Sequence, residues 1–218
     1  MPKANAKTHQ PLAASLGEQA YMALKRMIIT QTLHPGDQVN VAQLSAELSF
    51  GRTPIHLAIH RLEREGLLDV LPRKGILVKA ETLDSFLELM AARLLIEPWL
   101  TGQAVERASG ELVEKLDALL TQGREHQRNQ DRQGSMQVDR LFHQTLYAHA
   151  GNDILAEFAG SLLDRSMRLW FRPAMPIVDN PTVAELEDLL DTVRRGDKNE
   201  AIRRMEAHIS SIRSRFLA

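Results

Sequence analysis

Three side chains in the C-terminal half of the chain have residue types and spacing suited to binding a metal ion. Asp139 and His143 are four residues apart, so on a helix they lie on the same face. His208 lies near the end of the chain, in what we predict to be the last helix. If the two helices pack together, one carboxylate and two imidazoles can surround an ion such as zinc, nickel or manganese. Taken alone, an aspartate and a histidine four residues apart are better explained as a surface pair.

A second group of residues, within 44–78, has the pattern of a DNA-reading element. A helix is predicted with Thr53 as its cap and Pro54 at its first position. Apolar residues then recur at helical spacing until Gly66, which is expected to end the helix. Two short apolar strands follow, joined by a basic turn at 72–75. This pattern predicts a helix sized for the DNA major groove beside a hairpin with a positively charged tip.

Composition restricts the class of protein. The chain has 218 residues, a formal net charge of −1 and no cysteine, which excludes disulfides and fits a reducing cytoplasm. No apolar stretch approaches the roughly 20 residues that cross a membrane, and residues 1–16 lack the apolar core of a signal peptide. Residues 1–79 carry 10 Lys and Arg against 6 Asp and Glu, whereas the remainder carries 17 against 22. A basic front and an acidic back suit a nucleic-acid-binding module joined to a second module, although such a difference also arises by chance.

Periodicity predicts a mainly α-helical protein with two domains after a disordered arm at residues 1–16. Residues 17–79 are expected to form a winged helix-turn-helix, with the hairpin as a small β wing. Residues 80–218 are expected to form an all-helical bundle. Its six helices are expected at about 84–108, from 109 to beyond 123, and at 135–149, 153–171, 182–195 and 197–216.

Two sets of residues match a family pattern in order along the chain. The first consists of Tyr21, Leu24-Lys25, Ile28, Pro35-Gly36, Leu44, Leu48, Arg52-Thr53-Pro54, Arg61-Leu62, Glu65-Gly66-Leu67, Gly75 and Val78. The second consists of Arg93, Glu97-Pro98, Asp139, Phe142-His143, Gly151-Asn152, Gly196-Asp197, Ala201, Met205 and His208. On these residues, 17–79 resembles the winged helix-turn-helix of GntR-type bacterial transcription regulators. Residues 82–217 resemble the FCD effector-binding domain of the FadR branch.

The resemblance implies a homodimer that binds a palindromic operator in double-stranded DNA, usually as a repressor. A small organic acid bound in the helical domain is then expected to change the affinity for DNA. Many relatives hold this acid with a divalent metal on one aspartate and three histidines, to which Asp139, His143 and His208 correspond. The remaining histidine position falls on Leu186, which cannot bind a metal, so we expect weakened metal binding. In the alternative, polar groups hydrogen-bond the acid directly.

For the effector, the resemblance adds Arg93 and Asn152 to the three candidate metal ligands. A guanidinium fork matches a carboxylate through two hydrogen bonds, so Arg93 suits an acid. The alternative is an internal ion pair with Glu97, four residues away, and the sequence does not choose between them. Asn152 matches a family position but also suits a helix cap.

DNA contacts are implied for seven residues, namely Arg52, Thr53, His56, Arg61, Arg73, Lys74 and Gly75. Arg61 is expected to contact a phosphate, and the basic turn to approach the minor groove. The chain departs from the common motif at His56, which replaces an arginine, and at Leu57, which replaces a glutamate. Because an arginine that reads guanine contributes about 1–3 kcal/mol of discrimination, we expect an operator unlike that of typical relatives.

Two other functions compete with a ligand-responsive repressor. Leu186 keeps open a regulator of the same fold that has lost metal or effector sensing. A metal-dependent hydrolase at Asp139, His143 and His208 is disfavoured, because no general base or nucleophile lies in a convincing motif nearby. We therefore expect no enzymatic activity.

Overall fold

The computed structural model describes residues 14–73, 75–168 and 182–217, and its contacts divide the chain into two compact units. The first unit comprises residues up to 27 together with 36–79, and the second comprises 28–35 and 80–218. One boundary between the units follows Lys79, and residues 28–35 group with the second unit. Most of the arm predicted at 1–16 lies outside the described residues, and the first helix begins at Leu16.

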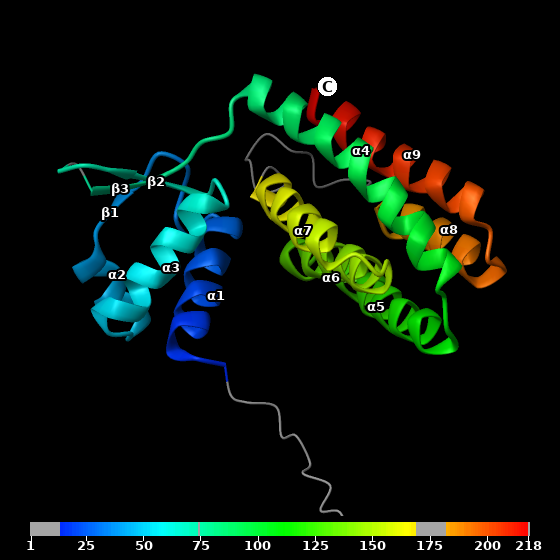
Figure 1. The fold of residues 1–218 in the computed structure, drawn as a ribbon, viewed down its shortest axis with the longest axis horizontal. Coiled ribbons are helices and arrows are strands. Elements are labelled where there is room, and N and C mark those ends of the chain that lie inside the picture. Colours follow the sequence, from blue (N-terminus) through cyan, green and yellow to red (C-terminus); the bar gives the residue numbers. More distant parts are fainter. Residues whose placement is uncertain (1–13, 74, 169–181, 218) are drawn as a thin grey trace, which may run out of the picture. The chain divides into compact units, whose positions relative to one another are not determined.

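The first unit combines helices with a small three-stranded antiparallel sheet (Figure 1). Its elements are α1 (Leu16–Ile29), whose last two residues group with the second unit, β1 (Gln38–Val39), α2 (Val41–Leu48), α3 (Arg52–Arg64), β2 (Leu68–Leu71) and β3 (Gly75–Val78). The β2–β3 hairpin is the predicted wing, and β3 lies between β2 and β1 in the sheet. Strand β1 is two residues long, which is too short to produce an alternating pattern, so the sequence did not indicate it.

Helix α3 begins earlier than its capping pattern suggests. Gly51 is the N-cap and makes no side-chain cap bond, so the prediction that Thr53 caps the helix is wrong. Pro54 is instead the third helical residue, where it is tolerated because the first N–H groups of a helix lack intrahelical partners. The predicted end is confirmed. Gly66 has a φ of +73°, and the Leu67 N–H donates back into the last turn at 2.9 Å, which closes a Schellman motif.

The second unit is an all-helical bundle, as predicted (Figure 1). Its described helices are α4 (Leu83–Glu106), α5 (Gly110–Arg128), α6 (Arg132–His149), α7 (Asp153–Met167), α8 (Thr182–Arg195) and α9 (Lys198–Leu217). Helix α4 packs along α9 and α7, while α5 packs against α6 and α8. The rings of Phe86 and Phe216 lie 3.9 Å apart between centroids and join the start of α4 to the end of α9.

Two helix boundaries differ from the prediction. Helix α6 starts at Arg132, earlier than expected, because Asp131 caps it and accepts a hydrogen bond from the Gly134 N–H at 2.9 Å. Helix α7 ends at Met167, and part of its predicted extension falls outside the described residues. In the described part of the chain, no helix combines the length and apolarity needed to cross a bilayer.

Candidate functional site

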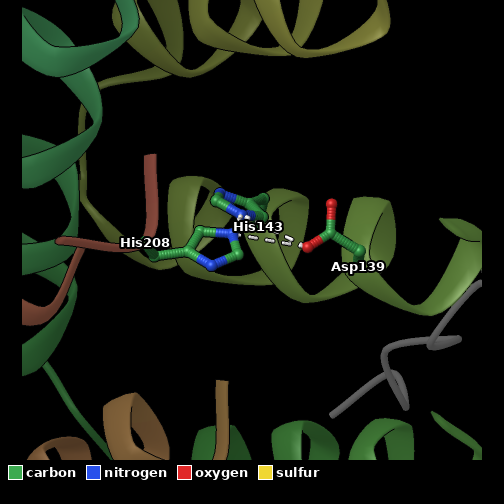
Figure 2. Close-up of side chains that lie close together, drawn as sticks. All are labelled: Asp139, His143 and His208. Carbon is green, nitrogen blue, oxygen red and sulfur yellow. Dashed lines mark hydrogen bonds and ion pairs between the residues drawn. The ribbon is translucent and has the colours of Figure 1, made fainter. Parts of the chain in front are cut away.

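Three buried side chains meet inside the bundle of the second unit. Asp139 and His143 lie one turn apart on α6, and His208 faces them from α9 (Figure 2). The Nε2 atoms of the two histidines are 3.2 Å apart. The nearer oxygen of Asp139, Oδ1, lies 3.5 Å from His208 Nε2 and 3.8 Å from His143 Nε2. The structure therefore brings together all three predicted metal ligands, with one donor atom of each within 4.8 Å of the others.

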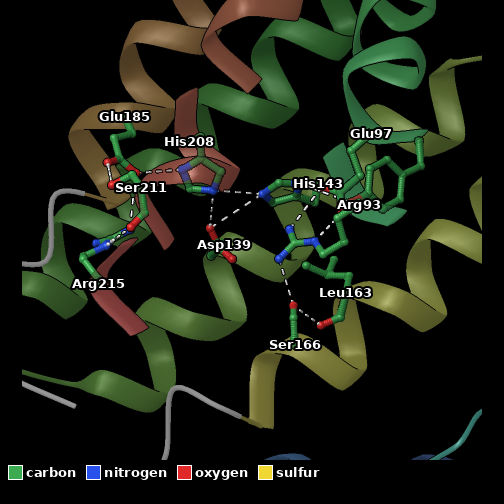
Figure 3. A network of polar contacts seen from close by, with 11 residues as sticks. Arg93, Glu97, Asp139, His143, Leu163, Ser166, Glu185, His208, Ser211 and Arg215 are labelled. Atoms are coloured by element: carbon green, nitrogen blue, oxygen red, sulfur yellow. Dashed lines mark hydrogen bonds and ion pairs between the residues drawn. The ribbon is translucent and has the colours of Figure 1, made fainter. Parts of the chain in front are cut away.

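Carboxylates on the far side of each ring fix the orientation of the two histidines. His143 Nδ1 lies 3.0 Å from Glu97 Oε2 and 3.2 Å from the Tyr147 hydroxyl. His208 Nδ1 lies 2.8 Å from Glu185 Oε2 (Figure 3). When Nδ1–H donates to a carboxylate, the Nε2 lone pair points the other way, which is the usual arrangement of a metal-binding histidine. Both Nε2 atoms are therefore turned towards Asp139.

The carboxylate of Asp139 tests whether these residues fit a cation. Its side chain is buried, and neither oxygen has a hydrogen-bond partner of ordinary geometry among the described residues. A buried carboxylate without such partners is costly unless a positive charge compensates it. One carboxylate with two Nε2 donors is also a donor set that zinc, nickel and manganese accept. The residues present fit a divalent metal.

A proton on His208 can also supply the positive charge that the buried Asp139 carboxylate needs. Burial by itself lowers the pKa of His208, but Asp139 and Glu185 outweigh burial and raise this pKa to about 9. Burial raises the pKa of Asp139, but His208, His143 and Arg93 outweigh it and hold this pKa below its ordinary value. At neutral pH His208 is therefore an imidazolium beside a carboxylate. A proton then relieves the repulsion that two facing Nε2 lone pairs would otherwise cause.

The buried guanidinium of Arg93 is bound to partners inside the bundle. Its guanidinium forms a two-pronged ion pair with Glu97, in which Nη2 donates to Oε2 at 3.1 Å, and Nη1 donates to Ser166 Oγ at 2.9 Å. Burial lowers the pKa of Arg93, but Glu97 outweighs it and raises the pKa. Burial likewise raises the pKa of Glu97, but Arg93 and His143 reverse this and hold the pKa well below its ordinary value. The internal ion pair is thus the arrangement present, and Arg93 is linked to the Asp139, His143 and His208 cluster through Glu97 and His143.

Two predicted positions do not join this cluster. Asn152 is the N-cap of α7 and accepts a hydrogen bond from the Leu155 N–H at 3.1 Å. It is fourteen residues before Ser166 on one helix, or about 20 Å away along the axis. We therefore assign Asn152 to capping instead of effector binding. Leu186 is fully buried in the apolar core, and its neighbour Glu185 is the residue of α8 that reaches His208.

Several residues of the site were not singled out by the sequence. Tyr147 continues the four-residue spacing of Asp139 and His143 along α6, so helical periodicity offered a signal for it. Glu185 and Ser166 offered none, because their partners His208 and Arg93 lie on other helices. Only the packing of the bundle brings these pairs together.

The predicted DNA contacts lie in the first unit, where α3 has one exposed polar stripe. Arg52, His56, His60 and Arg64 follow each other at intervals of four residues, and all are exposed. The rings of His56 and His60 stack with centroids 6.5 Å apart. Among the described residues, neither Arg52 nor Arg64 has an acidic partner within ion-pair distance. His60 and Arg64 were not predicted, although the same four-residue spacing from Arg52 would have found them.

Arg61 has a different environment. Its guanidinium lies 3.6 Å above the centroid of the Tyr21 ring, and it forms ion pairs with Glu18 at 2.7 Å and Glu65 at 3.3 Å. Lys25 Nζ donates to the Tyr21 hydroxyl at 2.6 Å and to Glu65 at 2.7 Å. These contacts hold α1 against α3. The structure places Arg61 in a packing role, and its phosphate contact stays a prediction.

The remaining predicted contacts lie on α3 and in the wing. Thr53 is exposed in the first turn of α3. Arg73 is exposed at the turn between β2 and β3, where its φ is +63°. Gly75, with a φ of +96°, starts β3. Lys74 lies outside the described residues.

Comparisons with known proteins cover both units. Residues 16–78 match the bacterial regulatory proteins of the gntR family, and residues 88–211 match the FCD domain. An uncharacterised HTH-type transcriptional regulator of Agrobacterium vitis is 30% identical over 161 residues, which are 66% of this chain and 91% of that protein. The HTH-type transcriptional repressor NanR of Cronobacter sakazakii is 27% identical over 231 aligned positions, covering 93% of this chain and 86% of the repressor.

Solved structures show the same fold. The structure of McbR/YncC from E. coli matches with a TM-score of 0.86 at 22% identity, covering 94% of this chain and 98% of the other. A crystal structure of a protein from Rhodococcus sp. RHA1 that is assigned to the GntR regulators matches with a TM-score of 0.77 at 17% identity, over 94% of this chain and 98% of the other.

Proposed function

The chain belongs to the GntR family of bacterial transcription regulators, in the branch with an FCD domain, and we propose that it represses genes by binding a palindromic operator as a homodimer. A small organic acid, bound in the helical unit together with a divalent metal, changes its affinity for DNA. The observation that carries the sensing half of this proposal is the shared orientation of His143 and His208. Both Nε2 atoms face the Asp139 carboxylate, which has no hydrogen-bond partner of ordinary geometry among the described residues. The two Nδ1 atoms face the carboxylates of Glu97 and Glu185.

The residues of the cluster divide the work of sensing. Asp139, His143 and His208 hold the metal, and Glu97 and Glu185 orient the two imidazoles. A divalent ion on three protein ligands supplies positive charge and a free coordination position, which suits a carboxylate oxygen. Because its guanidinium is occupied by Glu97, Arg93 acts as a positioning residue and not as the direct acid contact.

The DNA half of the proposal is supported by the exposed stripe of α3. Arg52 and Arg64 leave positive charge uncompensated by neighbouring acids among the described residues, which favours contact with phosphate. His56 and His60 can donate hydrogen bonds to bases or phosphates along the same face. Since histidine is not a two-pronged donor like arginine, the operator is expected to differ from that of relatives with an arginine at the position of His56.

Exposed apolar side chains on α4 and α7, which we call the apolar face, support the homodimer. These helices pack on each other in the bundle, yet large apolar side chains remain exposed on both. Leu95 and Trp99 on α4 are 79% and 44% exposed, and Ile154 and Phe158 on α7 are 83% and 50% exposed. A two-helix face can bury itself against a symmetric copy as a four-helix arrangement, so a second copy of this chain is the partner we propose.

Metal analysis and thermal shift measurements test the sensing half. We expect the purified protein to bind about one Zn²⁺ or Ni²⁺ per chain and to be stabilised by at least one acid in a panel of small organic acids. Asp139→Asn should lose both responses. Asp188→Asn is the matched control on the bundle surface, where Asp188 pairs with Arg204 at 2.9 Å, and it should keep both.

The same measurements separate the rival functions. A protein that binds its operator but takes up no metal and is stabilised by no acid is a regulator that has lost sensing, which Leu186 and the occupied Arg93 would then explain. Turnover of a substrate would overturn both regulator proposals. Operator selection from random duplexes tests the DNA half, and recovery of the sequence preferred by typical relatives would contradict the role given to His56.

A further inference from the structure

Three successive residues near the end of α7 bind three different parts of the second unit. Asp164 accepts from Arg140 on α6, with Nε at 2.5 Å from Oδ1. Arg165 donates to Glu81 through Nε at 2.9 Å and Nη2 at 3.1 Å. Ser166 accepts from Arg93 on α4 at 2.9 Å (Figure 3). We call Asp164–Ser166 the α7 hub.

Two of these contacts join the α7 hub to residues that neighbour the candidate metal ligands. Arg140 directly follows the candidate ligand Asp139 in the sequence. Arg93 pairs with Glu97, which orients His143. Because Asp164 and Ser166 are buried, these bonds form away from solvent, where hydrogen bonds to charged groups are strongest. A change in the position of Arg140 on α6, or of Arg93 and Glu97 on α4 beside His143, therefore acts on the α7 hub.

The third contact leads to the start of the second unit. The wing strand β3 ends at Val78, and Glu81 follows within three residues, just before α4. The Glu81 side chain is only 2% exposed, and it also accepts from Ser85 Oγ at 2.7 Å. Burial raises the pKa of Glu81, but its bonds to Arg165 and Ser85 outweigh burial and lower the pKa, so Glu81 is a carboxylate at neutral pH. The connection from the DNA-binding unit is thus held to α7 by a buried two-pronged ion pair.

We infer that the α7 hub transmits the state of the metal site to the Glu81 connection and so makes DNA affinity depend on what that site binds. The inference rests on the proposed function for its biological meaning. Its physical content is a contiguous chain of bonded groups, Arg93, Ser166, Arg165 and Glu81, in which the middle two are neighbours on one helix. Coupling through packed helices and hydrogen bonds of this kind requires that a change at one end be measurable at the other.

The structure supplies a matched pair of serines to test transmission. Ser166 Oγ and Ser161 Oγ each donate to the carbonyl three residues earlier on α7 at 2.7 Å, but only Ser166 also accepts from Arg93. Hydrogen exchange is measured in the full chain over the segment 80–86. Since a lost hydrogen bond of about 1 kcal/mol corresponds to roughly a fivefold change in an opening equilibrium, Ser166→Ala should speed exchange there by about that factor. Ser161→Ala should leave it unchanged.

Arg165 and Glu81 supply the second arm of the test. Arg165→Ala should bind Zn²⁺ with unchanged affinity, while the ratio of operator affinities with and without Zn²⁺ moves to near one. The charge-reversed double variant Glu81→Arg with Arg165→Glu should recover part of the wild-type ratio. Arg124→Ala is the control, because it breaks the 2.6 Å ion pair with Glu187 between α5 and α8 and does not touch the hub.

The hydrogen-exchange and operator-affinity measurements distinguish failure of transmission through the α7 hub, which we call the relay, from failure of the sensing proposal. Equal exchange in Ser166→Ala and Ser161→Ala would overturn the relay, as would an Arg165→Ala protein whose operator affinity responds fully to Zn²⁺. A wild-type protein that binds no metal contradicts the sensing proposal alone. In that case the exchange arm still decides whether Ser166 and the Glu81 connection are coupled.

Discussion

The proton on His208 occupies the place that a metal would take. With a pKa of about 9, the metal-free His208 is charged at neutral pH. A metal needs the neutral Nε2 lone pair, so the proton must leave when the ion binds. The stabilisation that this raised pKa gives the metal-free fold is present in full below the ordinary value of 6.5 and is lost as the pH rises through about 9.

Proton release on metal binding is the first prediction at the residue scale. Calorimetric titration with Zn²⁺ in buffers of different ionisation enthalpy should show about one proton released per ion at neutral pH. The number released should fall towards zero as the pH passes about 9. Binding without proton release at neutral pH would show that His208 is neutral beforehand.

Glu185 is the second residue whose role can be isolated. It orients His208 without belonging to the candidate ligands, and such partners typically change metal affinity by about 10–100-fold. Glu185→Gln should therefore weaken Zn²⁺ binding by roughly this factor while the fold remains intact. Glu187→Gln, on the same helix but paired with Arg124, should leave Zn²⁺ affinity unchanged. Equal effects of the two substitutions would exclude an orienting role for Glu185.

At the scale of the element, α3 separates reading from packing along its length. Its exposed stripe at Arg52, His56, His60 and Arg64 is available to DNA, while Arg61, between two of these positions, is turned towards α1. Neighbours along a helix point about 100° apart, so adjacent basic residues can have unrelated functions.

Arg64 and Arg61 therefore form a test pair. Arg64→Ala should weaken operator binding and reduce the slope of log affinity against log salt by about one, because one phosphate contact is lost. Arg61→Ala should instead lower the melting temperature of the DNA-binding unit, since it removes a stacked, ion-paired side chain. If Arg61→Ala also reduced the slope of log affinity against log salt, Arg61 would contact a phosphate, as the sequence predicts.

At the scale of the whole molecule, dimerisation must use surface that the single chain leaves exposed. Trp99→Glu places a charge in the apolar face on α4 and α7, and sedimentation equilibrium should show a shift from dimer towards monomer. Operator binding should weaken with it, because a palindrome is read by two linked heads. Leu217→Glu is the control, since Leu217 is also a large exposed apolar residue, 52% exposed, but belongs to α9 and not to α4 or α7. If the Trp99→Glu protein remained a dimer, the dimer interface would have to lie on another surface.

Short-range sequence patterns predicted many of the secondary-structure elements of this protein. The Gly66 stop, the hairpin wing and the helices of the bundle all follow from interactions within a few residues, so their patterns are visible in the sequence. The four-residue spacing of Asp139 and His143 likewise fixed their common face before any packing was known. Errors of detail, such as the cap of α3, arose where neighbouring residues could each fill the same local role.

Only the tertiary structure decided what those faces meet. Glu185 reaching His208, Ser166 reaching Arg93 and Arg165 reaching Glu81 are contacts between segments more than twenty residues apart. No periodicity encodes such pairs, because they depend on how whole helices pack. The same packing turned Arg93 inward to Glu97 and left Asp139 without a hydrogen-bond partner among the described residues. The sequence by itself determined a DNA-reading helix and a candidate set of metal ligands, while the folded bundle determined their orientation and their connection to the start of α4.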